Sequence, residues 1–163
     1  MSPFRPDLVD VWIFRVDPAH GLEILMLRRA PGRILAGLWQ GVSGSLEPGE
    51  RIANGALREL VEETGFGPGQ LAAFYDLDQV NQFHVASLDT VLTAAVFAAR
   101  VPPDIEPQLS DEHDAAEWLG LDEAIRRSVW PAYRESIRRI AGHLLEPVMA
   151  AWFVVPLPPR VVD

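Results

Sequence analysis

The feature that most constrains this chain is a helical pattern that lies between a glycine-containing loop and a glycine stop. From Arg51 to Glu63 the apolar residues recur with the period of about 3.6 residues that is typical of an α-helix. One face is expected to pack on a core, and it consists of Ala53, Ala56, Leu57, Leu60 and Val61. Gly65 stands where a left-handed residue commonly ends a helix, and residues 43–50 before the helix are expected to form a loop.

The same helix carries three carboxylates on a second face. At about 100° per residue, Glu59, Glu62 and Glu63 fall within an arc of about 100° that points away from the apolar face. Gly55 lies in this arc and is expected to leave the approach to it open. Three neighbouring carboxylates repel each other unless a cation neutralises them, and hard divalent cations prefer oxygen ligands. The pattern indicates a divalent-cation site, and the alternative is the acidic solvent face of an ordinary amphipathic helix.

The spacing around this helix resembles a known signature. Gly44 is followed after five residues by Glu50, and after seven more by Arg58-Glu59-Leu60, Glu62-Glu63 and Gly65-Phe66. This segment resembles the signature of the Nudix hydrolases. The resemblance implies an α/β fold, an α/β/α sandwich with a mixed β-sheet. It also implies dependence on Mg²⁺, for which Mn²⁺ can substitute, and hydrolysis of a nucleoside diphosphate linked to a further group.

The resemblance implies metal ligands at the matching positions. Glu59, Glu62 and Glu63 correspond to the metal-binding carboxylates of the family. The backbone carbonyl of Ser43 or Gly44 corresponds to an additional ligand. These residues are therefore expected to hold the cation.

The resemblance also implies a mechanism. Glu50 and Arg58 are expected to form an ion pair that holds the loop against the helix and so orients the ligands. A water molecule activated by the cation would attack a phosphorus atom in line, with Glu112 or Glu59 accepting its proton. From a nucleoside triphosphate the products would be the monophosphate and pyrophosphate.

A fourth carboxylate is expected from the acidic run that precedes Trp118. By analogy with the family, Glu112 is the candidate metal ligand or general base, and Asp111 and Asp114 are the alternatives. A solvated acidic loop without function is the competing interpretation. His113 is expected to pack within this loop.

Candidate substrate contacts lie on the strand and loop before the signature. Arg28 and Arg29 point to opposite faces of a predicted strand, so that one of them can steer phosphates, and Trp39 and Gln40 are candidate contacts to a base. Residues 38–50 are similar to the branch that hydrolyses dihydroneopterin triphosphate and (deoxy)nucleoside triphosphates. The alternatives are a dinucleoside polyphosphate or ADP-ribose hydrolase, and a non-catalytic module that senses a nucleotide.

Composition narrows the class of function. The chain has 163 residues and a net charge of −9, which disfavours binding to nucleic acid or to an anionic membrane. There is no cysteine, and all 14 basic residues are arginine, which excludes thiolate chemistry and a Schiff-base lysine. The longest apolar runs, 91–99 and 148–155, are too short to span a bilayer. A cytoplasmic protein that acts on a small nucleotide-like molecule is expected.

The rest of the sequence predicts one α/β domain, residues 1–163, with its core at about residues 8–145. Strands are expected at residues 9–16, 22–27, 38–42, 71–77, 90–101 and 115–119, and helices at 121–127 and 132–145. Strands 9–16 and 22–27 are expected to form a hairpin, and the apolar strand 90–101 is expected to be central in the sheet. The apolar, proline-rich segment 146–163 has no assignment, and it leaves open a homodimer in which this tail packs on a partner.

Overall fold

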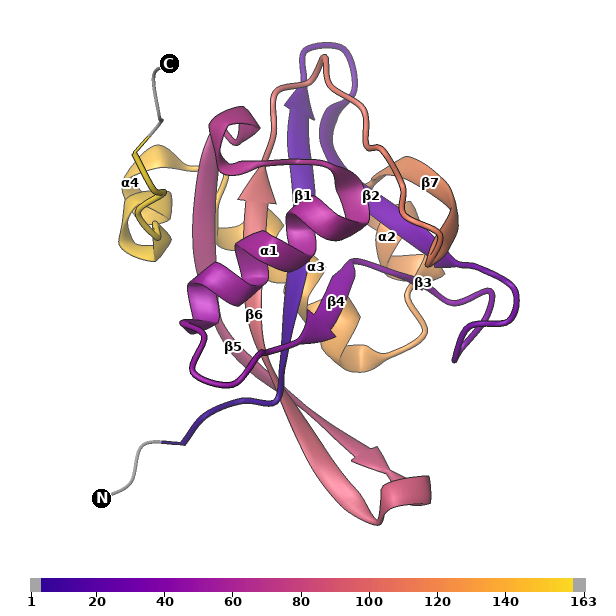
Figure 1. The fold of residues 1–163 in the computed structure, drawn as a ribbon. Helices are drawn as coiled ribbons and strands as arrows, with labels where there is room; N and C mark the ends of the chain where they lie inside the picture. Colours follow the sequence, from indigo (N-terminus) through magenta and orange to yellow (C-terminus); the bar gives the residue numbers. More distant parts are fainter. Residues whose placement is uncertain (1–3, 160–163) are drawn as a thin grey trace.

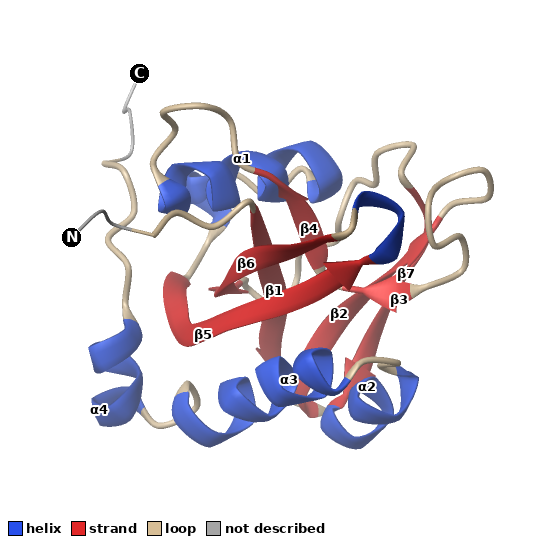
Figure 2. Ribbon diagram, turned by 90° about the horizontal axis from the view of Figure 1, so that it is seen from below, coloured by secondary structure: helices blue, strands red, loops and turns tan. Residues whose placement is uncertain are grey.

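The structure, a computed structural model, describes residues 4–159 as a seven-stranded mixed sheet between two layers of helices (Figure 1). The strands are β1 (Leu8–Asp17), β2 (Gly21–Arg29), β3 (Trp39–Gln40), β4 (Val42–Ser45), β5 (Ala73–Val85), β6 (Thr90–Arg100) and β7 (His113–Gly120). The helices are α1 (Ile52–Thr64), α2 (Leu121–Arg127), α3 (Pro131–His143) and α4 (Pro147–Ala150). Figure 2 shows α1 on one face of the sheet and α2 and α3 on the other. The α/β/α sandwich is therefore confirmed.

The sheet splits where its first two strands diverge. β1 and β2 form the expected antiparallel hairpin, which pairs from the turn as far as Ile13 and Leu25. Beyond this point the segment that follows β2 fills the split, because β3 pairs with β2 and β4 pairs with β1. Gly41 lies between β3 and β4, where a Cβ atom would be 2.8 Å from the Val11 carbonyl oxygen. The close approach of the two backbones at the split therefore requires glycine.

The other strands extend the sheet on both sides of this hairpin. β6 runs parallel to β1 and antiparallel to β5, so the apolar strand is central as predicted. β7 pairs with β2 on the far side. Alternate side chains of β1 enter two apolar cores: Val9 and Val11 lie beneath α1, whereas Trp12 and Phe14 pack against the layer of α2 and α3. The sheet is thus anchored on both faces.

Three elements differ from the sequence expectation. Residues 43–45 were expected in a loop but belong to β4, because the split in the sheet offers them the free edge of β1. β5 continues to Val85, past a register shift between Asp76 and Val80, and with β6 it forms an arm that projects from the body (Figure 1). β7 begins at His113, two residues before the predicted start. These extensions are rich in polar residues and glycine, so a pattern based on apolar residues does not extend through them.

The unassigned C-terminal segment forms α4 and a short 3₁₀ turn, Ala151–Phe153, and then returns to the edge of β5. There the Val155 N–H donates to the Phe74 carbonyl oxygen at 2.8 Å. Residues 160–163 of this tail lie outside the described residues, and a homodimer through the tail stays a prediction. Within residues 4–159 the helices are too short or too polar to cross a bilayer.

A buried carboxylate lies on the α3 side of β1. Asp10 is 2% exposed and accepts a hydrogen bond from Asn81 Nδ2 at 3.2 Å, while its Oδ1 has no partner within the described part of the chain. Gln79 donates to Asn81 Oδ1 at 2.7 Å, and Ser136 of α3 donates to Gln79 Oε1 at 3.0 Å. Burial raises the pKa of Asp10 to about 6, although the side chains of Ser43 and Asn81 oppose the shift. This polar network connects β1 to β5 and α3, and the ionised form of the buried Asp10 lowers the free energy of unfolding.

We predict that Asp10→Asn stabilises the protein at neutral pH. Because the pKa of Asp10 is higher in the folded than in the unfolded chain, its contribution to the free energy of unfolding falls as the pH rises from about 4 to 6. Ionised Asp10 costs on the order of 3 kcal/mol, and the amide keeps an acceptor for Asn81. In urea denaturation, the gain of the variant over the wild type should grow from near zero at pH 4 to ~1–3 kcal/mol at pH 7.5. The exposed control Asp104→Asn should show no such growth, and a gain that is equal at both pH values would contradict the prediction.

Candidate functional site

Helix α1 is buried on more sides than its apolar pattern predicts. Ala53, Ala56, Leu57 and Leu60 pack on the core as predicted, but Val61 is 43% exposed and does not. Glu59 and Glu63 are only 9% and 3% exposed, so the acidic face is not open as a whole. The sheet covers one side of the helix, and segments 42–50 and 102–112 contact its flanks. The site is therefore built from carboxylates that are partly withdrawn from water.

Arg58 joins the loop before α1 to the helix itself. Its guanidinium contacts the Glu50 carboxylate in two places, Nε to Oε1 at 2.9 Å and Nη2 to Oε2 at 3.0 Å, and Nη2 also donates to the Ser45 carbonyl oxygen at 2.9 Å. Nη1 donates to Glu59 Oε1 at 2.8 Å and lies 3.4 Å from Glu62 Oε2. The hydrogen bonds from Arg58 lower the pKa of Glu50 to about 2. One guanidinium thus contacts three of the acidic side chains of the segment, and its single positive charge offsets part of their negative charge.

Two glycines let the loop approach the helix. A Cβ atom at Gly44 would overlap the carboxylate of Glu59, so the absence of a side chain there makes the room that this carboxylate occupies. A Cβ atom at Gly55 would overlap Leu46 and lie 2.8 Å from Glu50 Oε2. Gly55 was expected to leave space for a ligand, and this is wrong, because the loop lies on it. Both glycines serve the close packing of loop on helix.

Glu63 and His113 form a buried pair. His113, which was expected within a loop, begins β7, and its Nδ1 lies 3.7 Å from Glu63 Oε2. Neither imidazole nitrogen nor Glu63 Oε2 has a hydrogen-bond partner among the described residues. Burial raises the pKa of Glu63 to about 9, with repulsion from Glu112 and Glu59 acting in the same direction, and burial lowers the pKa of His113. Without a cation, Glu63 therefore carries a proton at neutral pH.

The three acidic candidates near Trp118 have different partners. Glu112 Oε2 lies 3.5 Å from Arg29 Nη1, and its charge raises the pKa of Glu63, which places it on the α1 side. Asp111 binds an exposed arginine, Arg33, at 2.8 Å. Asp114 binds Arg28 at 2.7 Å, and Arg28 lies on the other side of the sheet, over Trp39. Of the three, Glu112 has the surroundings that a fourth carboxylate of the site requires.

Two of the three candidate substrate contacts, Arg28 and Trp39, lie on the face of the sheet opposite α1. Arg28 donates to Asp114 at 2.7 Å, and with Arg127 it lies over the ring of Trp39, which packs on the α2 and α3 side. Gln40 is buried opposite them, next to Leu27. The roles of Arg28, Trp39 and Gln40 stay predictions.

Two neighbours of the carboxylates were not singled out as site residues from the sequence, although Arg29 was weighed together with Arg28. Arg29, and not Arg28, is the arginine that contacts Glu112. His113 was assigned to loop packing but lies against Glu63. The alternation of β2 indicated that only one arginine faces α1, but it could not indicate which one.

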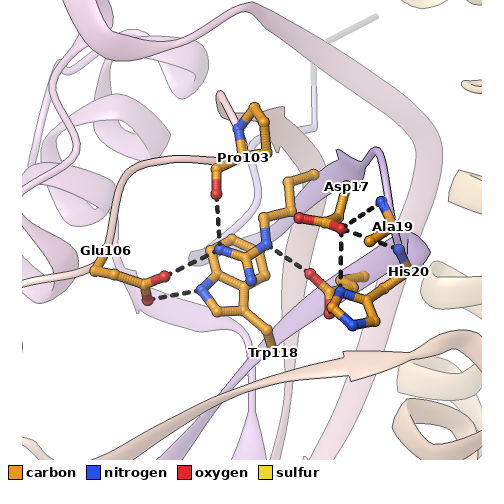
Figure 3. Close-up of polar contacts among 8 residues, drawn as sticks. Asp17, Ala19, His20, Pro103, Glu106 and Trp118 are labelled. Carbon is orange, nitrogen blue, oxygen red and sulfur yellow. Dashed lines mark hydrogen bonds and ion pairs between the residues drawn. The ribbon is translucent and has the colours of Figure 1, made fainter.

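A separate acidic cluster occupies the turn between β1 and β2. Asp17, His20 and Glu23 are the one group among residues 4–159 whose possible ligand atoms all lie within 4.8 Å of one another. The turn itself accounts for the cluster, since Asp17 Oδ1 accepts hydrogen bonds from the N–H groups of Ala19 and His20 (Figure 3). Glu23 in turn binds Arg15 at 2.7 Å. The cluster therefore needs no ion to explain it.

The α1 carboxylates fit a hard divalent cation. Glu59, Glu62 and Glu63 do not converge within that distance here, because Arg58 holds the first two. The donors are nonetheless all carboxylate oxygens, Glu63 Oε2 lacks any partner in the described structure, and Ser43 of β4 has its backbone close enough to affect the Glu63 pKa. Carboxylates that are partly buried and mutually repelling are suited to a cation such as Mg²⁺.

Comparisons with known proteins bear on the family of the chain and not on single site residues. A family model of the NUDIX domain matches residues 6–140. The chain is 37% identical over 119 residues to an octanoyltransferase of Myxococcus xanthus, covering 72% of this chain but only 32% of that protein, so it spans about a third of this relative. It is 36% identical over 104 residues to the asymmetrical bis(5'-nucleosyl)-tetraphosphatase of Sus scrofa, covering 63% and 67% of the two chains. The dihydroneopterin triphosphate pyrophosphohydrolase of E. coli superposes with a TM-score of 0.69 at 27% identity, covering 83% and 94%.

We predict that Gly44→Ala weakens divalent-cation binding more than it destabilises the fold. The new methyl group would displace the Glu59 carboxylate, which is the flexible end of a side chain, so the backbone need not move. Titration with Mn²⁺ followed by electron paramagnetic resonance should show affinity lowered by about tenfold, with a melting temperature within a few degrees of the wild type. In Gly142→Ala, where a Cβ atom meets nothing within 4 Å, affinity should stay the same. Equal Mn²⁺ affinity in the two variants would contradict the prediction.

We also predict that cation binding releases a proton from Glu63. A cation has to displace the proton that this side chain holds below about pH 9, so affinity should rise with pH by up to about tenfold per unit between pH 6 and 8. Calorimetric titration with Mg²⁺ in buffers of different ionisation enthalpy measures the released proton directly. Glu63→Gln has no proton to release, and a binding enthalpy of the wild type that is independent of the buffer would disprove the coupling.

Proposed function

Since this chain belongs to the Nudix hydrolase family, we propose that it cleaves a phosphoanhydride bond of a nucleotide-like substrate with the aid of Mg²⁺. The favoured substrate is a (deoxy)nucleoside or pterin triphosphate, which would yield the monophosphate and pyrophosphate. The observation that carries the proposal is the set of carboxylates on α1, the buried Glu59 and Glu63 and the exposed Glu62, with Glu112 on the facing segment.

The α1 carboxylates would hold the cation. Mg²⁺, or Mn²⁺ in its place, would offset the charge of the phosphates and of the developing leaving group on a chain whose net charge is −9. Glu63 is fixed by burial, whereas Glu59 and Glu62 can turn from Arg58 toward it, and the Ser43 carbonyl is the proposed backbone ligand. Arg58 keeps its two contacts to Glu50 and so holds the loop in place while the glutamates rearrange.

Glu112 is the proposed acceptor of the proton from the attacking water. Its carboxylate is partly exposed, which leaves it accessible to water, and its contact with Arg29 restrains its direction. Glu59 is the alternative acceptor. Its hydrogen bond from Arg58 Nη1 opposes protonation of this carboxylate, which suits a metal ligand better than a proton acceptor. The distinction between the two depends on which carboxylate faces the water once the substrate is bound.

The choice of substrate has support on two sides. The E. coli pyrophosphohydrolase and the similarity of residues 38–50 to its branch favour a triphosphate. The tetraphosphatase relative favours a dinucleoside polyphosphate as the second candidate. A non-catalytic sensing module is disfavoured because all three α1 glutamates and Glu112 are present.

The test is release of phosphate or pyrophosphate with Mg²⁺ or Mn²⁺ from pterin and nucleoside triphosphates, dinucleoside polyphosphates and ADP-ribose. We expect turnover of at least one compound, and we expect Glu62→Gln to lower kcat/KM by on the order of a hundredfold because it removes a charged ligand at the site. Glu62 is exposed, so the melting temperature should hardly change. Glu135→Gln is the matched control, because Glu135 also lies on a helix with an arginine partner four residues away, and it should keep full activity.

Two results would go against the proposal. If no compound is consumed with either cation, the chain is not a hydrolase of this class. If Glu62→Gln turns over at the wild-type rate, Glu62 does not belong to the ligand set.

A further inference from the structure

Glu112 is delivered to the site by the segment that connects β6 to β7, residues 102–112. This connecting segment is tied to the end of α1 by two backbone hydrogen bonds, from Gln108 N–H to the Thr64 carbonyl oxygen at 2.8 Å and from Ser110 N–H to the Glu63 carbonyl oxygen at 3.3 Å. Glu112 follows two residues later. The position of Glu112 therefore depends on how the segment lies along α1 and on the Ala30 N–H, which donates to the Glu112 carbonyl oxygen at 2.9 Å.

The first half of the connecting segment is held by Arg15 of β1. Arg15 Nη1 donates to the Pro103 carbonyl oxygen at 3.1 Å and to Glu106 Oε1 at 3.0 Å, while Nε donates to Glu23 Oε2 of β2 at 2.7 Å. The guanidinium lies 4.1 Å from the ring centroid of Trp118 in β7, whose Nε1 donates to Glu106 Oε2 at 2.9 Å. Figure 3 shows Glu106 and Pro103 converging on this point above Trp118. Arg15 thus connects the segment to three strands, its own β1, β2 through Glu23 and β7 through Trp118.

The chemistry of these contacts requires arginine. The Arg15 side chain is 11% exposed, so its charge-assisted hydrogen bonds are little screened by water. A guanidinium can donate along two edges and stack on an indole at the same time, whereas an ammonium cannot. Glu106 is itself largely exposed, yet each of its oxygens accepts a hydrogen bond from a different donor. These contacts hold residues 103–106 of the connecting segment against the sheet before the chain reaches α1.

We propose that Arg15 is a positioning residue for Glu112. By fixing residues 103–106 on the sheet, it sets the register in which Gln108 and Ser110 bind the end of α1, and hence the place of the Glu112 carboxylate beside Glu63. Arg15 itself takes no part in the chemistry. The inference rests on the proposed function, in which Glu112 acts on the water or the cation.

The test is a double-mutant cycle of Arg15→Met and Glu112→Gln. Methionine keeps an apolar stem over Trp118 but removes every hydrogen bond of the guanidinium. With the substrate identified in the panel, Arg15→Met should lower kcat about tenfold with less than about a twofold change in KM, because a misplaced group costs rate more than binding. In the Glu112→Gln background the same substitution should lower kcat less than about twofold, since its target is already absent. Arg126→Met, an exposed arginine with one carboxylate partner, is the control.

Hydrogen exchange tests the same inference without turnover. In Arg15→Met the amides of Gln108 and Ser110 should exchange about tenfold faster, whereas the Gly65 amide, which binds within α1, should be unchanged. Equal factors in kcat in the two backgrounds, or unchanged exchange at both amides, would overturn the proposal. If the wild type consumes no compound, the proposed function fails independently of this inference. The Mn²⁺ affinity of the wild type, the two single variants and the double variant is then measured instead of kcat. Additive effects of the two substitutions on that affinity would overturn the positioning role of Arg15.

Discussion

The guanidinium of Arg58 lies among carboxylates that would otherwise repel each other in a partly buried space. It binds Glu50 through two nitrogens, reaches the Ser45 carbonyl, and still has Nη1 free for Glu59. The loop, the helix and the glycines between them depend on this arrangement, since removing the charge would leave the acids of α1 and the loop facing each other without compensation. The same guanidinium also contacts Glu59 and Glu62, so its positive charge reduces the repulsion among the carboxylates of the site.

The split sheet explains how β4 reaches the acids of α1. β1 and β2 separate after a short hairpin, and the chain passes through the gap at Gly41, so that β4 delivers Ser43 and Gly44 to the side of α1. The connecting segment 102–112 closes the other flank. Glu63, between the two, loses its water on both sides, and this burial, more than any neighbouring charge, keeps it protonated in the absence of a cation.

The sequence predicted the parts of this site that follow from periodicity and from local conformation. Helix α1, its end at Gly65 with φ of 74°, the hairpin and the central β6 were all within reach of such patterns. Burial of Glu59 and Glu63 was not, because a helical period identifies the face that meets the sheet and contains no information on loops that cover the flanks. Likewise, alternation along β2 separated Arg28 from Arg29, but only the fold places Arg29 beside Glu112.

The contacts of the connecting segment limit how its length can vary. Its polar ties fall on Glu106, Gln108 and Ser110, while the side chains of Ile105 and Leu109 pack against the α1 core. From Ile105 to Leu109 less exposed and more exposed residues alternate, and inserting or deleting one residue within this stretch would exchange them. Substitutions in this stretch are compatible with the fold wherever the alternation is preserved. A change of a single residue in its length would expose Leu109, bury Glu106 and move the Glu112 carboxylate away from α1.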